Sequence, residues 1–115
     1  MAGQIVRVWG GFGTHDGVDR YCREHFPNSV LPRLRSIDGF VEVKVMTRRG
    51  RDETEVVVAT TWESIEAVKA FAGEDYQRAV VEPVVGELLN RFDERVAHFT
   101  LAVAASTSPV RQAGG

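Results

Sequence analysis

Two runs with the side-chain repeat of a β-strand lie close together in the middle of the chain, and they constrain its fold most. In residues 40–47 valine occupies every second position from Val41 to Val45, with charged residues or methionine between them. Residues 55–62 form a second run, rich in β-branched and aromatic residues. A period of two is typical of half-buried strands. Because only the polar stretch 48–53 joins the two runs, we predict an antiparallel hairpin.

The residues before this hairpin predict a strand followed by a helix. Residues 5–9 are β-branched and aromatic and predict the strand, which the glycine-rich segment 10–13 ends. Apolar residues then recur at spacings of three and four from Val18 to Ile37, as one buried helical face requires. Thr14 or Asp16 is the predicted N-cap. Because proline disrupts a helix interior, Pro27 predicts a break near residues 26–28.

The residues after the hairpin predict the same order again. Ser64 is a predicted N-cap and Gly73 a predicted stop for a helix that buries Ile65, Val68 and Phe71. Further helical segments are expected over 74–92, interrupted at Pro83, and a last strand over 96–105.

The predicted order is therefore β-α-β-β-α-β. It is typical of a ferredoxin-like α+β domain, with helices on one face of an antiparallel sheet. The 115 residues suit one domain, over 1–105, and the small and polar residues 106–115 predict a flexible C-terminal tail.

The alternation also assigns side chains to the two faces of the sheet. We expect the valines of 40–47 and Ala97, Phe99, Leu101 and Val103 to face the helices. The opposite, outer face then carries Trp9, Phe40, Met46, Val96 and His98 among a few charges. A face this apolar is unusual on a soluble monomer. It predicts that a second copy of the chain covers the outer face in a homodimer.

Composition and charge exclude several classes of function. The net charge of −2 gives no long-range attraction to nucleic acid or to an anionic membrane surface. No apolar stretch is long enough to span a membrane, and the N-terminus lacks a signal-peptide pattern, so the cytoplasm is the expected location. Cys22 is the single cysteine and cannot form an intrachain disulfide. The three histidines are not spaced as metal ligands, so we expect no metal site.

Two residues are candidates for chemistry. His98 is the candidate general acid or base, because an imidazole titrates near neutrality and could take a phenolic proton. The alternative for His98 is a hydrogen bond across the dimer. Trp62 could stack on a flat substrate, or it could anchor the core.

Four further residues are candidates for binding. Arg7 and Trp9 share one face of the first strand, and Arg7 could bind an acidic group or pair with Glu42. Phe71 and Tyr76 could form walls of a ligand cavity, with core packing as the alternative.

From about residue 4 to residue 103 the chain resembles the antibiotic biosynthesis monooxygenase family. The segments that carry the resemblance are Val6–Gly10, Leu31–Phe40, Thr61–Ser64, Ala67–Asp75 and Phe92–Phe99. The resemblance implies a dimeric α+β barrel. It also implies a small monooxygenase that oxidises an aromatic or polyketide-like substrate with O2 and uses no cofactor. The other function kept open is a non-catalytic dimeric domain that binds a small apolar molecule.

The functional residues of the family can be compared with this chain position by position. Trp62 stands where quinone-forming members have a tryptophan. Val58 replaces the asparagine expected four residues earlier, and Val68 replaces the tyrosine expected six residues later. In the haem-degrading branch the helical tryptophan would fall at Phe71 and the haem ligand at Val81, so haem breakdown is not expected.

Overall fold

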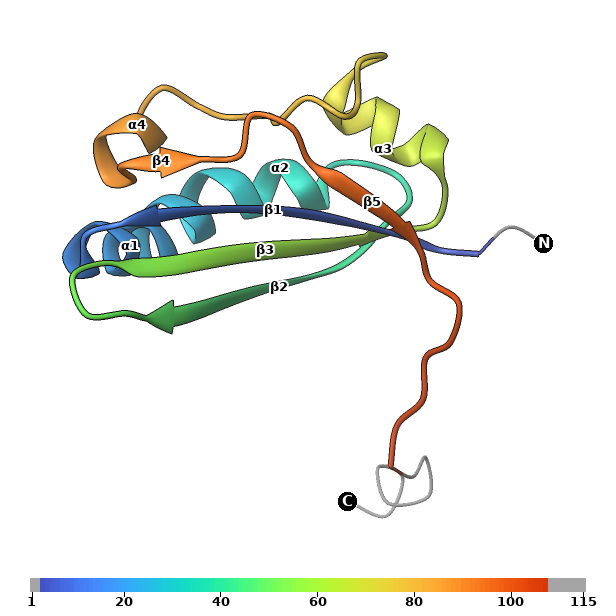
Figure 1. Ribbon diagram of the computed structural model, residues 1–115. Helices are drawn as coiled ribbons and strands as arrows, with labels where there is room; N and C mark the ends of the chain where they lie inside the picture. The colour runs from blue at the N-terminus through green and yellow to red at the C-terminus, as the bar shows by residue number, and fades with distance from the viewer. Residues whose placement is uncertain (1–2, 108–115) are drawn as a thin grey trace.

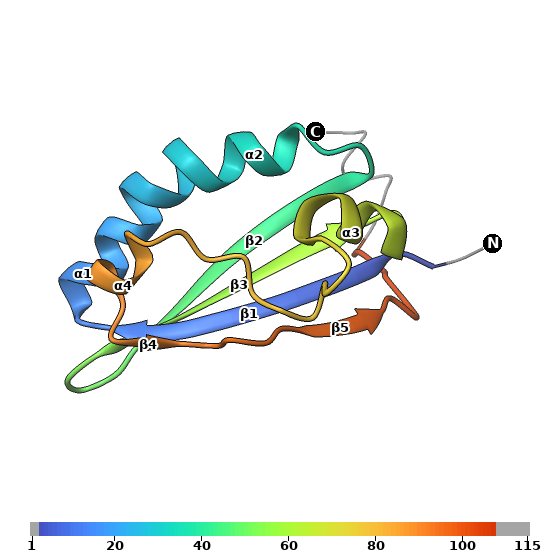
Figure 2. The same cartoon turned by 90° about the horizontal axis from the view of Figure 1, so that it is seen from above.

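The computed structural model describes residues 3–107 and has two layers, an antiparallel sheet and a helical layer on one of its faces (Figures 1 and 2). The strand order is β2-β3-β1, and both β4 and β5 pair with the remaining edge of β1. This is the ferredoxin-like order with its last strand in two pieces, so the predicted α+β class is confirmed. The elements are β1 (Ile5–Gly13), α1 (His15–Arg20), the π-helix η1 (Tyr21–Val30), α2 (Leu31–Arg35), β2 (Phe40–Arg49), β3 (Thr54–Trp62), α3 (Ile65–Ala72), α4 (Val85–Leu88), β4 (Arg91–Phe92) and β5 (Ala97–Thr100).

The first helical region continues through Pro27, where the sequence predicts a break. α1, η1 and α2 follow one another directly from His15 to Arg35. Pro27 lies inside η1, whose ten residues are wound as a π-helix. Proline removes one α-helical hydrogen bond and clashes with the preceding turn. The wider i→i+5 winding takes up this defect, so the helix continues without an interruption. The predicted N-cap Thr14 is confirmed, since its hydroxyl accepts a hydrogen bond from the Gly17 amide at 2.9 Å.

The second helical region is much shorter than predicted. Ser64 caps α3 by accepting from the Ala67 amide, and Gly73 ends it at a φ of 88°, as expected. Residues 73–84, which we call the crossing loop, are not helical. Their main chain instead pairs with residues 94–96, through Ala79 N to Glu94 O and Val96 N to Gln77 O, both 2.8 Å. β-branched valines and Pro83 disfavour helix here, and this pairing satisfies the backbone instead.

The core lies between β3 and the helices. Trp62, Leu34, Val18, Val56 and Val68 are fully buried there. Within residues 3–107, no helix is both long and apolar enough to cross a membrane.

The last strand is shorter than predicted and shows its other face to the helices. β5 ends at Thr100, because its partner β1 starts at Ile5. Beyond this pair the two segments share only the hydrogen bond from Leu101 N to Gln4 O. His98 pairs with Arg7, which is 5% exposed beneath the helices, so His98 also faces the helices. Phe99 points outward and is 57% exposed. A one-residue change of register exchanges the faces of a strand, and both faces of this segment contain apolar residues. The pattern of apolar residues therefore did not determine which face of this strand packs against the helices. The predicted orientations of Ala97, Phe99 and His98 were wrong.

Two aromatic residues predicted on the outer face also lie on the helical side. Trp9 pairs with Val58, whose side chain is buried in the core. An irregularity in pairing between Phe40 and Glu42 turns Phe40 inward, where its ring centroid lies 5.5 Å from that of Trp62. Such a bulge changes the side-chain alternation locally.

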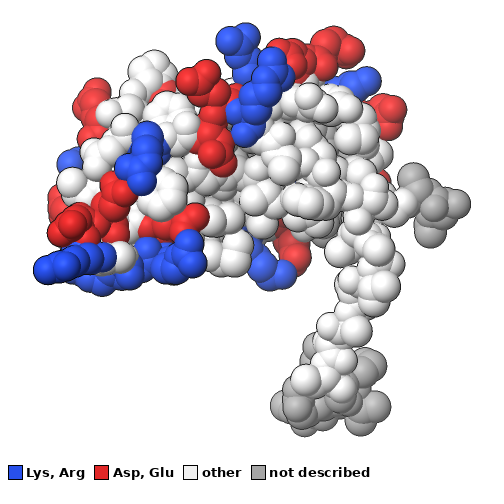
Figure 3. Space-filling model, viewed as in Figure 1, with Lys and Arg blue, Asp and Glu red and all other residues white. Residues whose placement is uncertain are grey.

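The outer face of the sheet is still largely apolar, with other residues than predicted. Figure 3 looks toward this face and shows uncharged side chains over β5 and the neighbouring sheet, while charged side chains gather near the hairpin end and along the upper rim. Phe99 and Met46 are exposed on the outer face, and Val6, Val8, Val57 and Ala59 are half-buried.

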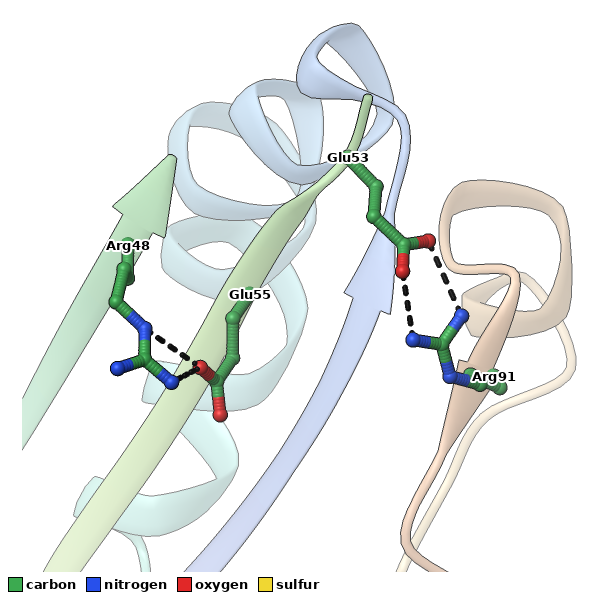
Figure 4. A network of polar contacts seen from close by, with 4 residues as sticks. All are labelled: Arg48, Glu53, Glu55 and Arg91. Atoms are coloured by element: carbon green, nitrogen blue, oxygen red, sulfur yellow. Dashed lines mark hydrogen bonds and ion pairs between the residues drawn. The ribbon is translucent and has the colours of Figure 1, made fainter. Parts of the chain in front are cut away.

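Charged pairs connect the hairpin end to its neighbours (Figure 4). Arg48 of β2 contacts Glu55 of β3 at 2.5 Å, and Arg91 of β4 binds both carboxylate oxygens of Glu53 at 2.6 and 3.1 Å. The contact with Arg91 holds the pKa of Glu53 below its usual value. Exposed pairs of this kind add little stability each. The pair of Arg91 with Glu53 connects β4 to the hairpin end.

We expect Gly39→Ala to lower the free energy of unfolding by about 1–3 kcal/mol. Gly39 has a φ of 93°, and an added Cβ would lie 2.6 Å from the Cβ of Ala67. Gly86→Ala is the matched control, because no atom lies within 4 Å of its added Cβ. Urea unfolding of both variants measures the difference. Equal stability of the two variants would contradict this account of Gly39.

Candidate functional site

A cavity of about 70 Å³ lies between the sheet and the helical layer, and we call it the central cavity. Its walls come from β1, β3, η1, α2, α3 and the crossing loop. They are mostly apolar and aromatic, with a few charged or polar groups, a composition common in small-molecule sites. The lining residues are Arg7, Trp9, Tyr21, His25, Ser29, Val30, Arg33, Leu34, Val58, Thr60, Phe71, Val80, Val81, Glu82, Val85 and Val96.

Arg7 places a buried positive charge on the sheet side of this cavity. Its guanidinium donates to the carbonyl oxygens of Tyr76 and Arg78, the second at 3.1 Å. Among the described residues, no carboxylate lies within ion-pair distance of it. Glu42, the predicted partner, is on the outer face and pairs with Lys44 at 3.1 Å. Burial lowers the pKa of Arg7 to about 10, so the group remains charged at neutral pH.

His98 lies beside Arg7 and is not part of the cavity wall. Its Nε2 is 3.0 Å from Nη1 of Arg7. A guanidinium only donates hydrogen bonds, so this Nε2 accepts, which assigns a neutral ring with its proton on Nδ1. Desolvation, with the Arg7 charge second, lowers the pKa of His98. The ring of Tyr76 packs edge-on against the imidazole at 5.1 Å. Tyr76 thus contacts His98 and binds Arg7 through its carbonyl, outside the cavity.

Trp62 is fully buried behind the cavity wall. Its ring lies between Phe40 and Phe71, at centroid distances of 5.5 and 5.4 Å, and its Nε1 donates to Thr60 Oγ1 at 2.8 Å. Val58 and Val68 belong to the same packed cluster. The surroundings of Trp62 are therefore filled, and Trp62 contacts the cavity wall through Phe71 and Thr60.

Two of the predicted binding residues are aromatic parts of the wall. Phe71 lies between two guanidinium groups, those of Arg7 and Arg33, whose Cζ atoms are 5.8 and 5.0 Å from its ring centroid. Trp9 packs against Tyr21 at 6.1 Å, and its Nε1 donates to the Asp93 carbonyl at 2.9 Å. The structure thus brings Arg7, Trp9 and Phe71 together at one cavity.

The helical wall carries polar groups that are not among the predicted site residues. Tyr21, His25, Ser29 and Arg33 all line the cavity at a spacing of four residues. Residues four apart lie on the same face of a helix, so this spacing places the four side chains along one side of the helical region that runs through η1 and α2. The four-residue repeat was the signal available in the sequence, and the expected break at Pro27 obscured it.

His25 and Glu82 meet at this wall. The His25 side chain is 9% exposed, and its Nε2 lies 3.2 Å from Oε1 of Glu82. The two atoms are not aligned for a hydrogen bond, so the buried Nε2 has no hydrogen-bond partner among the described residues. Ser29 Oγ lies 2.7 and 3.0 Å from the two carboxylate oxygens of Glu82 and donates its one hydrogen to this carboxylate. Glu82 thereby fixes the crossing loop to η1.

These observations define a ferredoxin-like α+β domain with an aromatic-walled cavity between sheet and helices. Residues 12–83 match the antibiotic biosynthesis monooxygenase family. The chain belongs to this family.

Solved structures show the same fold at low sequence identity. A Bacillus cereus protein assigned to the antibiotic biosynthesis monooxygenases is 20% identical, with a TM-score of 0.63 over 91% of this chain and 99% of that one. The ActVA-Orf6 monooxygenase of Streptomyces coelicolor, solved with the ligand nanaomycin D, is 21% identical, with a TM-score of 0.63 over 93% and 94%. The designed protein Foldit4 is 17% identical, with a TM-score of 0.56 over 86% and 99%. A search of curated proteins gave no match.

We expect His98 to titrate below its ordinary value of 6.5, and its pKa to rise in an Arg7→Met variant that lacks the neighbouring charge. Because the pKa is lowered by folding, the stability due to neutral His98 is present above pH 6.5 and is lost as pH falls toward the folded value. Histidine NMR titration measures the first effect, and unfolding between pH 5 and 7 measures the second. An unchanged His98 titration in the variant would argue against the contact with Arg7.

Proposed function

We propose that the chain is a cofactor-independent monooxygenase that oxidises an aromatic, phenolic or polyketide-like molecule with O2 in the central cavity. The observation that carries this proposal is Arg7, a buried cation without a carboxylate partner among the described residues, at an aromatic-walled cavity. Burying an uncompensated charge is costly, and such groups concentrate at functional sites. An anionic oxygen of a bound phenolate or enolate would supply the missing negative charge.

The chemistry of such a substrate fits this charge. Loss of a proton from a hydroxyl, or from a ring methylene beside a carbonyl, gives an electron-rich anion that can react with O2 directly. For a ring methylene the reaction balances, because the methylene and one molecule of O2 give a ring carbonyl and one molecule of water. One oxygen atom enters the new carbonyl, and the other leaves in water with both methylene hydrogens. Arg7 would stabilise the oxyanion as its charge develops.

The predicted site residues take distinct parts in this proposal. Trp9 and Phe71 would stack on the flat faces of the substrate. His98 and Tyr76 contact Arg7 and would hold its guanidinium in place. Trp62 would position Phe71. In this arrangement His98 would therefore act indirectly, through Arg7, and Trp62 would act indirectly, through Phe71.

The second candidate is a non-catalytic domain that binds a small apolar molecule, and the mostly apolar lining of the central cavity favours it. Val58 and Val68 supply no polar group toward Trp62.

Oxygen uptake with hydroxylated anthrones and naphthols tests the first candidate. We expect one O2 consumed per molecule oxidised, and a loss of kcat/KM of about 100- to 1000-fold in Arg7→Met, since one oxyanion-stabilising group is removed. Arg23→Met is the control, because Arg23 is exposed on η1 and pairs with Asp19. Saturable binding of these compounds with no uptake above buffer would instead support the non-catalytic domain.

We also propose that two copies of the chain pack their outer sheet faces together. The uncharged area around Phe99 on this face supports the proposal (Figure 3). Phe99→Asp should convert a dimer to a monomer, because it would place a charge in the interface. Light scattering after gel filtration measures the mass, with Arg35→Glu on α2 as the control. A monomeric native protein would contradict this assembly.

A further inference from the structure

The central cavity has charged or titratable groups on two opposite sides. Arg7 faces it from the sheet, while Tyr21, His25 and Arg33 face it from the helices and Glu82 from the crossing loop. A general base must lie within hydrogen-bond reach of the substrate's proton, directly or through one water, so these groups are the candidates for it.

Elimination leaves one good acceptor among them. The guanidinium groups of Arg7 and Arg33 are already protonated and only donate. Burial raises the pKa of Tyr21, with smaller contributions from Cys22 and Glu82, so its phenol stays protonated. The Glu82 carboxylate already accepts the single hydrogen of the Ser29 hydroxyl, which lies near both of its oxygens. His25 remains, with a buried Nε2 that has no hydrogen-bond partner among the described residues.

We propose that His25, positioned by Glu82, accepts the proton of the substrate from the helical side of the central cavity while Arg7 binds the resulting oxyanion from the sheet side. This assignment rests on the proposed function, and it gives the task first predicted for His98 to a different histidine.

The proton transfer is balanced within the site. The O–H or C–H bond of the substrate breaks, its electron pair stays on the substrate, and a new N–H bond forms on neutral His25. The resulting imidazolium lies 3.2 Å from Glu82, whose negative charge stabilises it. The Glu82 side chain is 45% exposed, so the proton can leave to water beside it.

The two opposite groups also define a class of substrate. The molecule must carry its acidic hydrogen on one edge of a ring and an oxygen on the opposite edge. Hydroxyanthrones meet this condition across their central ring, and 4-nitrophenol meets it across a single ring. The second compound is therefore a small probe that does not depend on turnover.

The first experiment measures the visible absorbance of 4-nitrophenol bound to the full chain, at a pH where free 4-nitrophenol is largely protonated. We expect the bound probe to be ionised in the native protein. In His25→Gln and in Glu82→Gln the ratio of ionised to protonated probe should fall about 10-fold or more. Glu82 is half-exposed, so its variant remains informative if a change at buried His25 impairs folding. His15→Gln is the control, since His15 binds Thr54 outside the central cavity.

The second experiment measures oxygen uptake with 1,8-dihydroxyanthrone. His25→Ala should lower kcat about 100-fold or more with little change in KM, and added imidazole should restore part of the rate. A purely structural role of His25 would not give this rescue. In Glu82→Gln we expect a lower kcat and a changed pH profile, because the imidazolium loses its counter-charge.

The outcomes separate the two proposals. If native protein shows no uptake but His25→Gln removes the ionised probe, oxygenation fails and the assignment of His25 stands. If uptake continues and the probe ionises equally in His25→Gln, the assignment of His25 is wrong and oxygenation stands. Absence of 4-nitrophenol binding would also overturn the assignment, because the cavity would then not accept a ring with oxygens at both ends.

Discussion

The buried guanidinium of Arg7 connects the parts of this molecule that would otherwise be independent. From the first half of β1 it contacts His98 on β5 and binds two carbonyl oxygens of the crossing loop. These contacts hold an irregular segment over the sheet, where little regular secondary structure would fix it. These partners are carbonyl groups and a neutral imidazole, which accept hydrogen bonds but carry no negative charge. The positive charge of Arg7 is therefore not neutralised by a carboxylate in the described part of the chain. The same group therefore organises the loop and gives the cavity its electrostatic character.

The parts of the fold that could be predicted are those with a local cause. The period of two in residues 40–47 and 55–62 predicts the hairpin, and Thr14, Ser64 and Gly73 mark helix ends through their own hydrogen bonds or backbone angles. The prediction of which face of the last strand is buried was wrong, because both faces carry apolar residues. The register of this strand with β1 decides which face is buried. The helix predicted over the crossing loop was also wrong. The main chain of this loop pairs with residues 94–96, and local sequence propensity does not indicate such pairing.

The candidate site was predicted in part. Arg7, Trp9 and Phe71 were selected as binding residues, and they do meet at one cavity. Trp62 and His98 were selected for chemistry, and they lie behind that cavity, one packed against Phe71 and the other against Arg7. His25 was not among the predicted site residues, because Pro27 implied that the helix ends near it, whereas a π-helix continues through Pro27. Residue type alone could identify candidate groups here, but their roles depend on which side of an element faces the cavity.

The sheet topology has a consequence for the timescales on which parts of the site open. β1 is hydrogen-bonded along both edges, to β3 on one side and to β4 and β5 on the other, whereas the crossing loop has only scattered backbone bonds. Amides in a doubly paired strand exchange their hydrogens with solvent mainly through global unfolding, and those of loosely bonded loops exchange through local opening. The cationic wall of the cavity thus belongs to the slowest-exchanging part of the protein, and its cover belongs to one of the fastest. Local opening of the loop would release the Arg7 guanidinium from the Tyr76 and Arg78 carbonyls, but Arg7 would stay on β1, so the site would keep its charge through each such event.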